Sequence, residues 1–156
     1  MSDARVENRV SVDALASFLH QVDKLFPVPL SAKQNLDDFA RKLCEKATLC
    51  VAHDGEVIVA LVAGYTDHVV DNMGYISIAA TLPQVQGRGY SSSLIREFLD
   101  IAREKQLQAV HLYAVRENAP AMHMYRKLGF VDYYVKDEPR PKDAHLILYL
   151  EKEGEE

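Results

Sequence analysis

Cysteine is scarce in this chain, with only two among the 156 residues. Cys44 and Cys50 are too few, and have no partners at ligand spacing, for a disulfide framework or a cysteine-based metal cluster. Long apolar runs are also missing: none approaches the roughly 18 residues that a membrane span needs, and residues 1–9 lack the apolar core of a signal peptide. No Asn-x-Ser/Thr sequon occurs. We therefore expect a cytoplasmic protein with no metal and no membrane partner.

An excess of positive charge is absent as well. The 18 Lys and Arg residues are outnumbered by 23 Asp and Glu residues, which gives a net charge of -5 and a pI near 5.7. This balance argues against nucleic acid as a partner, since nucleic-acid binding favours a basic face. The length and the 48% hydrophobic content are typical of one globular domain. We predict one domain over residues 1–150 and an acidic, solvated tail over residues 151–156.

Two amphipathic helices are expected near the start, because apolar residues recur there at helical spacing. The first stripe is Val12, Leu15, Leu19, Val22 and Phe26, and the second is Leu36, Phe39, Ala40, Leu43 and Ala47. Pro27 and Pro29 separate the two helices. Ser31 and Gln34 have capping-box spacing, which predicts that Ser31 caps the second helix.

Strands and helices alternate in the rest of the chain. Residues 48–53 and 56–66 predict a hairpin around Asp54-Gly55, a dipeptide suited to positive φ angles. The expected elements after the hairpin are a strand over 73–82, a helix over 91–105, a strand over 110–115, a helix over 119–128, and strands over 130–136 and 145–150. This order predicts an α/β fold with one mixed sheet and helices on both faces.

The segment between the third strand and the following helix reads Gln86-Gly87-Arg88-Gly89-Tyr90-Ser91. Glycines let backbone N–H groups approach an anion closely, and a helix N-terminus adds partial positive charge, so a phosphate ester suits such a loop. A P-loop is excluded because no Gly-Lys-Ser/Thr follows, and a dinucleotide fingerprint would need glycine where Ser92 stands. A plain turn at the two glycines, with no ligand, is the alternative.

A second constellation lies further along, where Asn118, Ala121, Tyr125, Gly129 and Phe130 stand in the order N-x-x-A-x-x-x-Y-x-x-x-G-F. With the Q-x-x-G-x-(G/A) pattern of the loop, this chain strongly resembles the GNAT superfamily of acyl-CoA-dependent N-acetyltransferases. The detailed likeness covers residues 75–130, and the order of elements agrees over the whole chain. One departure is Ser91, which stands where the loop motif ends in Gly or Ala and still permits close backbone approach.

The resemblance implies a single-domain GNAT-like fold whose mixed central sheet is splayed between its fourth and fifth strands, here the strands that end at Leu82 and Val115. Acetyl-CoA would be the cosubstrate, with its pantetheine arm paired to the backbone of the first of these strands and its pyrophosphate on the loop amides. Asn118 would hold the pantetheine or the loop, and Tyr125 would face the thioester sulfur. The implied cofactor-binding residues are Ala79, Ala80, Thr81, Gln86, Gly87, Arg88, Gly89, Tyr90, Ser91, Ser92 and Asn118.

Tyr125 is the expected catalytic residue. A tyrosine with an ordinary pKa of ~10 is protonated at pH 7, so it can give its proton to a departing thiolate, whose conjugate acid has a pKa of ~8.5 if it resembles the cysteine thiol. A backbone N–H near Thr81 or Leu82 would polarise the thioester carbonyl.

The general base has no clear candidate, because Tyr113 occupies the position where some relatives carry Glu and residues 73–81 hold no carboxylate. His111 and Tyr113 are candidates for assistance, as are Asp67, His68 and Asp71. Deprotonating a lysine-like amine at pH 7 costs ~4.6 kcal/mol, whereas an α-amine near pKa 8 costs only ~1.4 kcal/mol. We therefore favour an acceptor of low pKa, such as an α-amine or an amino sugar.

Several alternatives stay open at this point. The acceptor is a small molecule or a peptide or protein amine, and residues 26–30, 67–72 and 137–144 are the segments expected to recognise it. Transfer of a longer acyl group is a rival activity, and a non-catalytic acyl-CoA-binding or sensing domain is a rival class. A homodimer is compatible with the late strands, although no pattern requires one.

Overall fold

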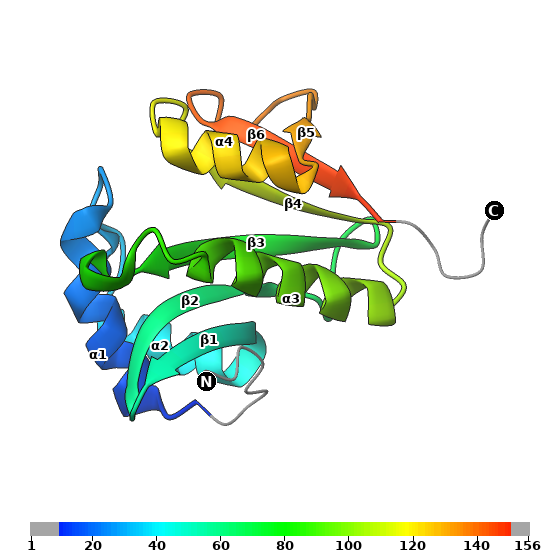
Figure 1. Ribbon diagram of the computed structural model, residues 1–156. Coiled ribbons are helices and arrows are strands. Elements are labelled where there is room, and N and C mark those ends of the chain that lie inside the picture. Colours follow the sequence, from blue (N-terminus) through cyan, green and yellow to red (C-terminus); the bar gives the residue numbers. More distant parts are fainter. Residues whose placement is uncertain (1–9, 151–156) are drawn as a thin grey trace. The chain divides into compact units, whose positions relative to one another are not determined.

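The computed structural model describes residues 10–150, so the predicted acidic tail lies outside the described part of the chain (Figure 1). These residues form two compact units. Unit 1 comprises residues 10–64 and 78–98, and unit 2 comprises residues 65–77 and 99–150. The expectation of one domain over residues 1–150 stays a prediction, and each unit is described by itself.

The strands form one six-stranded sheet in the order β1-β2-β3-β4-β6-β5. Their bounds are β1 Thr48–Asp54, β2 Val57–Tyr65, β3 Met73–Thr81, β4 Ala109–Ala114, β5 Val131–Asp132 and β6 Ala144–Tyr149. β3 and β4 run parallel, pairing Met73 with Ala109 through Ile76 with Leu112, whereas β4 and β5 are both antiparallel to β6. The predicted mixed α/β sheet is confirmed, and the strands ending near Leu82 and Val115 are third and fourth along this chain.

The predicted hairpin joins β1 to β2 in antiparallel register. Asp54 pairs with Val57, which leaves Gly55 and Glu56 as the two central residues of the turn. Gly55 has a φ of +65°, as the first central residue of a two-residue hairpin turn requires when it is glycine. The Asp-Gly signal therefore located the turn to within one residue: Asp54 is the last residue of β1, and the two central residues lie one position later than predicted.

The two N-terminal helices are α1 (Val12–Val22) and α2 (Leu36–Lys46). α1 is shorter than its apolar stripe suggested, because the chain continues as a 3-10 turn over Asp23–Leu25 and becomes extended at Phe26. Pro27 follows Phe26, and a residue before proline is disfavoured in the helical region. Phe26 therefore belongs to the connection and not to the helix.

The predicted cap of α2 at Ser31 is wrong. Ser31 lies in a separate 3-10 turn, Leu30–Ala32, where its amide and hydroxyl donate to the Asp23 carboxylate at 2.8 and 2.6 Å. The amide nitrogen of Asp38 donates instead to Asn35 Oδ1 at 3.0 Å. Because asparagine caps a helix as well as serine does, the residue directly before the helix takes the role and Ser31 is held by a charged acceptor.

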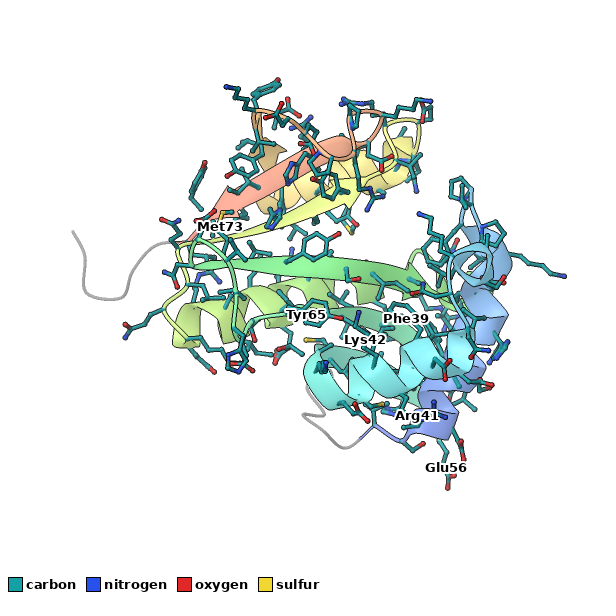
Figure 2. The ribbon with its side chains drawn as sticks, turned by 180° about the vertical axis from the view of Figure 1, so that it is seen from behind. Phe39, Arg41, Lys42, Glu56, Tyr65 and Met73 are labelled. Atoms are coloured by element: carbon teal, nitrogen blue, oxygen red, sulfur yellow. The ribbon has the colours of Figure 1, made fainter. Side chains whose placement is uncertain are left out.

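Unit 1 has helices on both sides of its strands. α1 and α2 cover one side of β1 and β2, and the first half of α3 (Tyr90–Glu104) covers the other, as the two opposite views show (Figures 1 and 2). Phe18, Leu19 and Leu43 are fully buried on the first side, as are Leu94 and Phe98 on α3. Burial of such side chains contributes about 1.5–3 kcal/mol each. This packing fixes the start of α3 relative to the end of β3.

Unit 2 contains α4 (Ala119–Leu128) and the β4, β6 and β5 strands. Gly129 ends the helix with a left-handed φ of +112°, and a Cβ there would lie 3.3 Å from Leu148. α4 therefore packs on the sheet face that carries Leu148. Strand register places His111 and His145 on the opposite face, because side chains alternate along a strand.

The last predicted strands have different lengths in the structure. The strand expected over residues 130–136 shortens to Val131–Asp132, and one further bond joins the Tyr133 amide to the His145 carbonyl at 2.8 Å. The chain then leaves the sheet, with Tyr134 86% exposed and Asp137 at a φ of +59°. The strand predicted over residues 130–136 is therefore too long, whereas β6 matches its predicted range to within one residue.

Candidate functional site

The glycine-containing loop has the backbone geometry expected of an anion cradle. Gly87 and Gly89 both adopt a φ of +83°, and a Cβ added at either would meet nothing within 4 Å. The glycines are needed for their left-handed conformation, because L residues with side chains rarely adopt it. The space in front of both is open, so a ligand can approach the backbone there.

Two side chains tie this loop to the end of β3. Gln86 donates from Nε2 to the Thr81 carbonyl at 3.2 Å, and the Ser91 and Thr81 hydroxyls are hydrogen-bonded at 2.8 Å. Val85, which lies between Thr81 and Gln86 in the sequence, is buried. Gln86 and Ser91 therefore shape the loop, and the Ser91 hydroxyl that replaces the family's Gly or Ala has a structural partner.

The start of α3 supplies the donors of the loop. The first intrahelical bond runs from Ser93 N to Gly89 O at 3.0 Å, so the amides of Tyr90, Ser91 and Ser92 precede the helical ladder. Amides at this position carry the positive end of the helix dipole and bind phosphate oxygens well. The exposed side chain of Arg88 adds a full positive charge.

The end of β3 corrects one expectation about the thioester carbonyl. The Leu82 amide donates to the Val59 carbonyl at 2.9 Å, so it is not available to polarise a substrate carbonyl. Ala79, Ala80 and Thr81 are half-buried at the end of the strand. Of the two amides expected from the sequence, that of Thr81 remains the candidate.

Tyr125 lies within α4 of unit 2 and is only 8% exposed. Its ring packs edge-on against Phe130, with the ring centroids 5.8 Å apart, and burial raises the pKa of its phenol to about 12. Within residues 10–150, no hydrogen-bond partner is found for its hydroxyl. A buried hydroxyl without a partner is costly, which indicates a group reserved for a ligand.

Asn118 has a local structural role. Its Oδ1 accepts from the Ala121 amide at 3.2 Å and thereby caps α4. Pro120 occupies the first turn, where its missing N–H costs nothing. Asn118 and the αL residue Gly129 thus define the two ends of the helix that carries Tyr125.

A polar cluster that the sequence did not predict occupies the sheet face of unit 2 opposite α4. His111 Nδ1 and His145 Nε2 lie 2.8 Å apart, and His145 Nδ1 lies 2.7 Å from Glu138 Oε2. The Tyr113 hydroxyl donates to the other carboxylate oxygen of Glu138, which also accepts from the Arg140 amide at 3.2 Å. Glu138 is therefore the centre of a hydrogen-bonded group drawn from two strands and one loop.

The electrostatics of the cluster keep Glu138 ionised and His111 neutral. Burial is the largest influence on Glu138 and acts to raise its pKa, but hydrogen bonds from Tyr113, His145 and the Arg140 amide together hold the pKa below its usual value. Burial, and then the electrostatic interaction with His145, lower the pKa of His111. Burial and then the Glu138 hydrogen bond raise the pKa of Tyr113, so its phenol stays protonated at neutral pH.

Other expected assistants have different partners. Asp67 forms an ion pair with Lys105 at 2.9 Å, and the Asp71 carbonyl accepts from Gln108. His68 and Asp71 adopt positive φ values of 54° and 57° in the same loop. These contacts favour a structural role for that loop over a catalytic one.

Sequence reasoning identified His111 and Tyr113 but missed Glu138 and His145. The antiparallel register places His145 directly opposite Tyr113, and their rings stack with centroids 4.1 Å apart. The cross-strand pair was recoverable only by aligning the two predicted strands, since residues 113 and 145 are far apart in sequence. Glu138 lay in a segment predicted to recognise the acceptor, with no pattern that pointed to it.

The described residues contain neither a metal-binding group of side chains nor a membrane-spanning helix. Over residues 10–150, no three His, Cys, Asp or Glu side chains are grouped so that they could hold a metal ion. Over the same span, no helix combines the length and apolarity required to cross a membrane.

Comparisons with known proteins agree with the loop and helix motifs. Residues 16–130 match the acetyltransferase (GNAT) family. A mycothiol acetyltransferase of Tsukamurella paurometabola is 36% identical over 61 residues, which are 39% of this chain and 21% of that protein. The N-alpha-acetyltransferase MAK3 of Arabidopsis thaliana is 29% identical over 79 residues, 51% of this chain and 42% of that protein. The matched segments thus span less than half of either relative.

The fold is similar to that of solved acetyltransferase structures. The PaiA N-acetyltransferase of Thermoplasma acidophilum, solved in complex with coenzyme A, superposes with a TM-score of 0.65. At 12% identity the alignment covers 95% of this chain and 96% of that one, so the likeness concerns the fold. The family match extends over most of the chain and includes both motifs. The chain belongs to the acetyltransferase (GNAT) family.

Proposed function

We propose that this protein transfers the acetyl group of acetyl-CoA directly to a primary amine. The observation that carries the proposal is the buried Tyr125 hydroxyl, for which no protein partner is found among the described residues. A domain that only binds or senses acyl-CoA has no need of a buried phenol reserved for a ligand. A phenol with a pKa of about 12 is protonated throughout the physiological range and can act as a proton donor.

The donor site that we propose uses the residues expected from the sequence. Ala79, Ala80 and Thr81 would pair with the pantetheine through their backbone. The pyrophosphate would lie on the amides of Gly87 to Ser92, with Arg88 supplying charge and Gln86 and Ser91 holding the loop in shape. Asn118 would act by capping the Tyr125 helix. The open space before Gly87 and Gly89 supports this assignment.

The proposed reaction conserves atoms and charge. The neutral amine nitrogen attacks the thioester carbon, a C–N bond forms, and the C–S bond breaks. The thiolate takes a proton from Tyr125, and the tyrosine regains one from the nitrogen that becomes the amide. An acceptor that starts as an ammonium ion must lose one further proton before attack, so the net reaction releases one proton to water.

The acceptor that we propose is an amine of low pKa, namely an α-amine or an amino sugar. An α-amine near pKa 8 costs ~1.4 kcal/mol to deprotonate at pH 7, against ~4.6 kcal/mol for a lysine side chain. The name of one relative, an N-alpha-acetyltransferase, supports the α-amine. A cytoplasmic location and a homodimer remain further proposals, which cell fractionation and sedimentation would test.

The donor site is tested by thermal denaturation with and without CoA and acetyl-CoA. A ligand at 100 times its dissociation constant adds ~2.7 kcal/mol to the stability of the folded state. Gly89→Glu should abolish this gain, because a carboxylate would repel the pyrophosphate. Gly55→Glu is the matched control: its φ is also positive and a Cβ there also meets nothing within 4 Å, but it lies in the β1–β2 turn. Equal loss of the CoA effect in both variants would refute the loop assignment.

Turnover is tested by measuring free thiol released from acetyl-CoA with three acceptors. These are a short peptide with a free α-amine, glucosamine, and Nα-acetyl-lysine. We expect the first or second to react faster than the third. Stabilisation by acetyl-CoA without transfer to any of them would favour the binding or sensing alternative, and preference for Nα-acetyl-lysine would refute the low-pKa acceptor.

A further inference from the structure

The proposed function leaves one proton without a protein acceptor, and the cluster in unit 2 offers one. Three side chains form a continuous chain there: Glu138 Oε2 lies 2.7 Å from His145 Nδ1, and His145 Nε2 lies 2.8 Å from His111 Nδ1. His145 is buried, while His111 and Glu138 are half-buried. The inference that follows rests on the proposed function.

The carboxylate fixes the tautomer of both histidines. An ionised carboxylate only accepts hydrogen bonds, so His145 must carry its proton on Nδ1, next to Glu138. When His145 is neutral, its Nε2 atom is an acceptor, and His111 then donates to it from Nδ1. His111 is left with a bare Nε2, for which no hydrogen-bond partner is found over residues 10–150.

The surroundings of His111 favour a proton acceptor at this atom. The aromatic, titratable and charged groups around it come from every neighbouring element: Tyr75 on β3, Tyr113 on its own strand, Tyr133 after β5, His145 on β6, and Glu138 and Arg140 in the loop. The pKa of His111 is lowered, mainly by burial, so the ring is neutral and ready to accept at pH 7. The Glu138 carboxylate is connected to His111 through His145. It offsets the positive charge that His111 gains with the proton.

We infer that His111 Nε2 removes the extra proton of the acceptor ammonium, directly or through one water molecule, and that His145 and Glu138 are positioning residues that hold His111 in the accepting tautomer. When Nε2 takes the proton, the proton on Nδ1 can shift to His145, and the positive charge then lies beside the Glu138 carboxylate. After the product leaves, the shift reverses and Nε2 releases the proton to water. No redox partner or further reactant is needed.

The cluster also provides the carboxylate that position 113 lacks. Tyr113 stands where some relatives carry Glu, and its hydroxyl donates to Glu138. Glu138 and His145 line a surface pocket of about 270 Å³. Glu138 therefore places a negative charge from the loop beside Tyr113 on β4.

The first test needs no acceptor. In the full-length protein labelled with ¹⁵N-histidine, NMR at pH 7 should show His111 and His145 both neutral, both protonated on Nδ1 and both bare on Nε2. A His111 protonated on Nε2, or doubly protonated at pH 7, would overturn the inference. The exposed His123 on α4 provides an internal reference signal.

The second test compares pH profiles of kcat/KM for His111→Gln, Glu138→Gln and the control His123→Gln, with the α-amino peptide as acceptor. General acid–base catalysis contributes about 10²–10⁴-fold, so His111→Gln should lose at least about 10²-fold at pH 7. The loss should shrink as pH approaches the pKa of the acceptor, because the amine then loses its proton unaided. His123→Gln should match the wild type.

Glu138→Gln tests the positioning role. The acid limb of its kcat/KM profile should move to lower pH, because the negative charge that favours the imidazolium is gone. A purely structural role of Glu138 would leave that limb in place. CoA-induced stabilisation should survive in all three variants, which shows that they fold and bind the donor. If the wild type transfers the acetyl group and His111→Gln has the same pH profile, His111 is not the proton acceptor, although the proposed function stands. If the wild type binds the donor but transfers no acetyl group, the proposed function itself is refuted.

Discussion

Tyr125→Phe should make the protein less active and more stable at the same time. The substitution removes a single hydroxyl from a side chain that is 8% exposed, and within residues 10–150 that hydroxyl has no hydrogen-bond partner to lose. Leaving a buried hydroxyl unsatisfied costs about 1–3 kcal/mol. For a chain of this length, a gain of 1 kcal/mol raises Tm by about 2–4 °C, which calorimetry of the unliganded protein resolves.

The same variant should respond differently once CoA is bound. A phenol that donates to the coenzyme sulfur adds stability to the wild-type complex only, so the Tm advantage of Tyr125→Phe should narrow at saturating CoA. Turnover should fall by at least about 10²-fold, the usual contribution of a proton donor. Donor affinity for the pyrophosphate and pantetheine should persist.

Alkaline titration gives an independent measure of the burial of Tyr125. Its pKa in the folded protein is about 12, against an ordinary value of ~10. Above pH 10 the unfolded chain ionises first, so stability is lost as the pH rises from 10 to 12, by about 3 kcal/mol in all. Other tyrosines titrate in both proteins, so the difference between wild type and Tyr125→Phe isolates this one. A decrease of more than about 1 kcal/mol in the stability of Tyr125→Phe at neutral pH would refute the reasoning.

Three further substitutions test the structural assignments. Asn118→Ala should cost about 1 kcal/mol in urea denaturation through the loss of the α4 cap, and no loss would refute the capping role. Asn35→Ala should likewise reduce hydrogen-exchange protection at the start of α2, whereas Ser31→Ala should not, because Ser31 is bonded to Asp23 and not to the helix; equal effects would restore the capping box. Asp67→Asn should change stability by less than 1 kcal/mol, as expected for an exposed ion pair, and leave kcat unaltered, whereas a large fall in kcat would make that loop catalytic.

The parts of the fold that the sequence predicted are those encoded locally. Apolar stripes of helical period located α1 and α2, and Asp54-Gly55 located the hairpin to within one residue. The glycines of the anion loop were predictable for the same reason, since a positive φ is a property of one residue and its neighbours. Errors occurred where two local signals competed, as between Ser31 and Asn35, or where the predicted strand continued beyond the last paired residue, as after Asp132.

The chemistry of the cluster depends instead on register, which is not local. His111 and His145 meet only because Tyr113 pairs with His145 and not with a neighbour, and a shift of one residue would turn His145 to the opposite face of the sheet. The apolar residues of β6 favour that register: Leu146 and Leu148 are buried on the α4 side, and a slip would turn them away from α4.

The absence of a carboxylate in β3 and at position 113 therefore did not mean that the site lacks negative charge. Glu138, in a loop 25 residues after Tyr113, accepts a hydrogen bond from the Tyr113 hydroxyl. His145 on β6 lies between this carboxylate and His111. In the proposed mechanism, the charge acts through two imidazoles and not by direct contact with the amine. Such an arrangement favours an acceptor that loses its proton easily, because neutral imidazole is a much weaker base than a lysine side chain. The proposed role of His111 and the proposed preference for a low-pKa amine are thus linked, because both depend on an imidazole, and not a carboxylate, as the base.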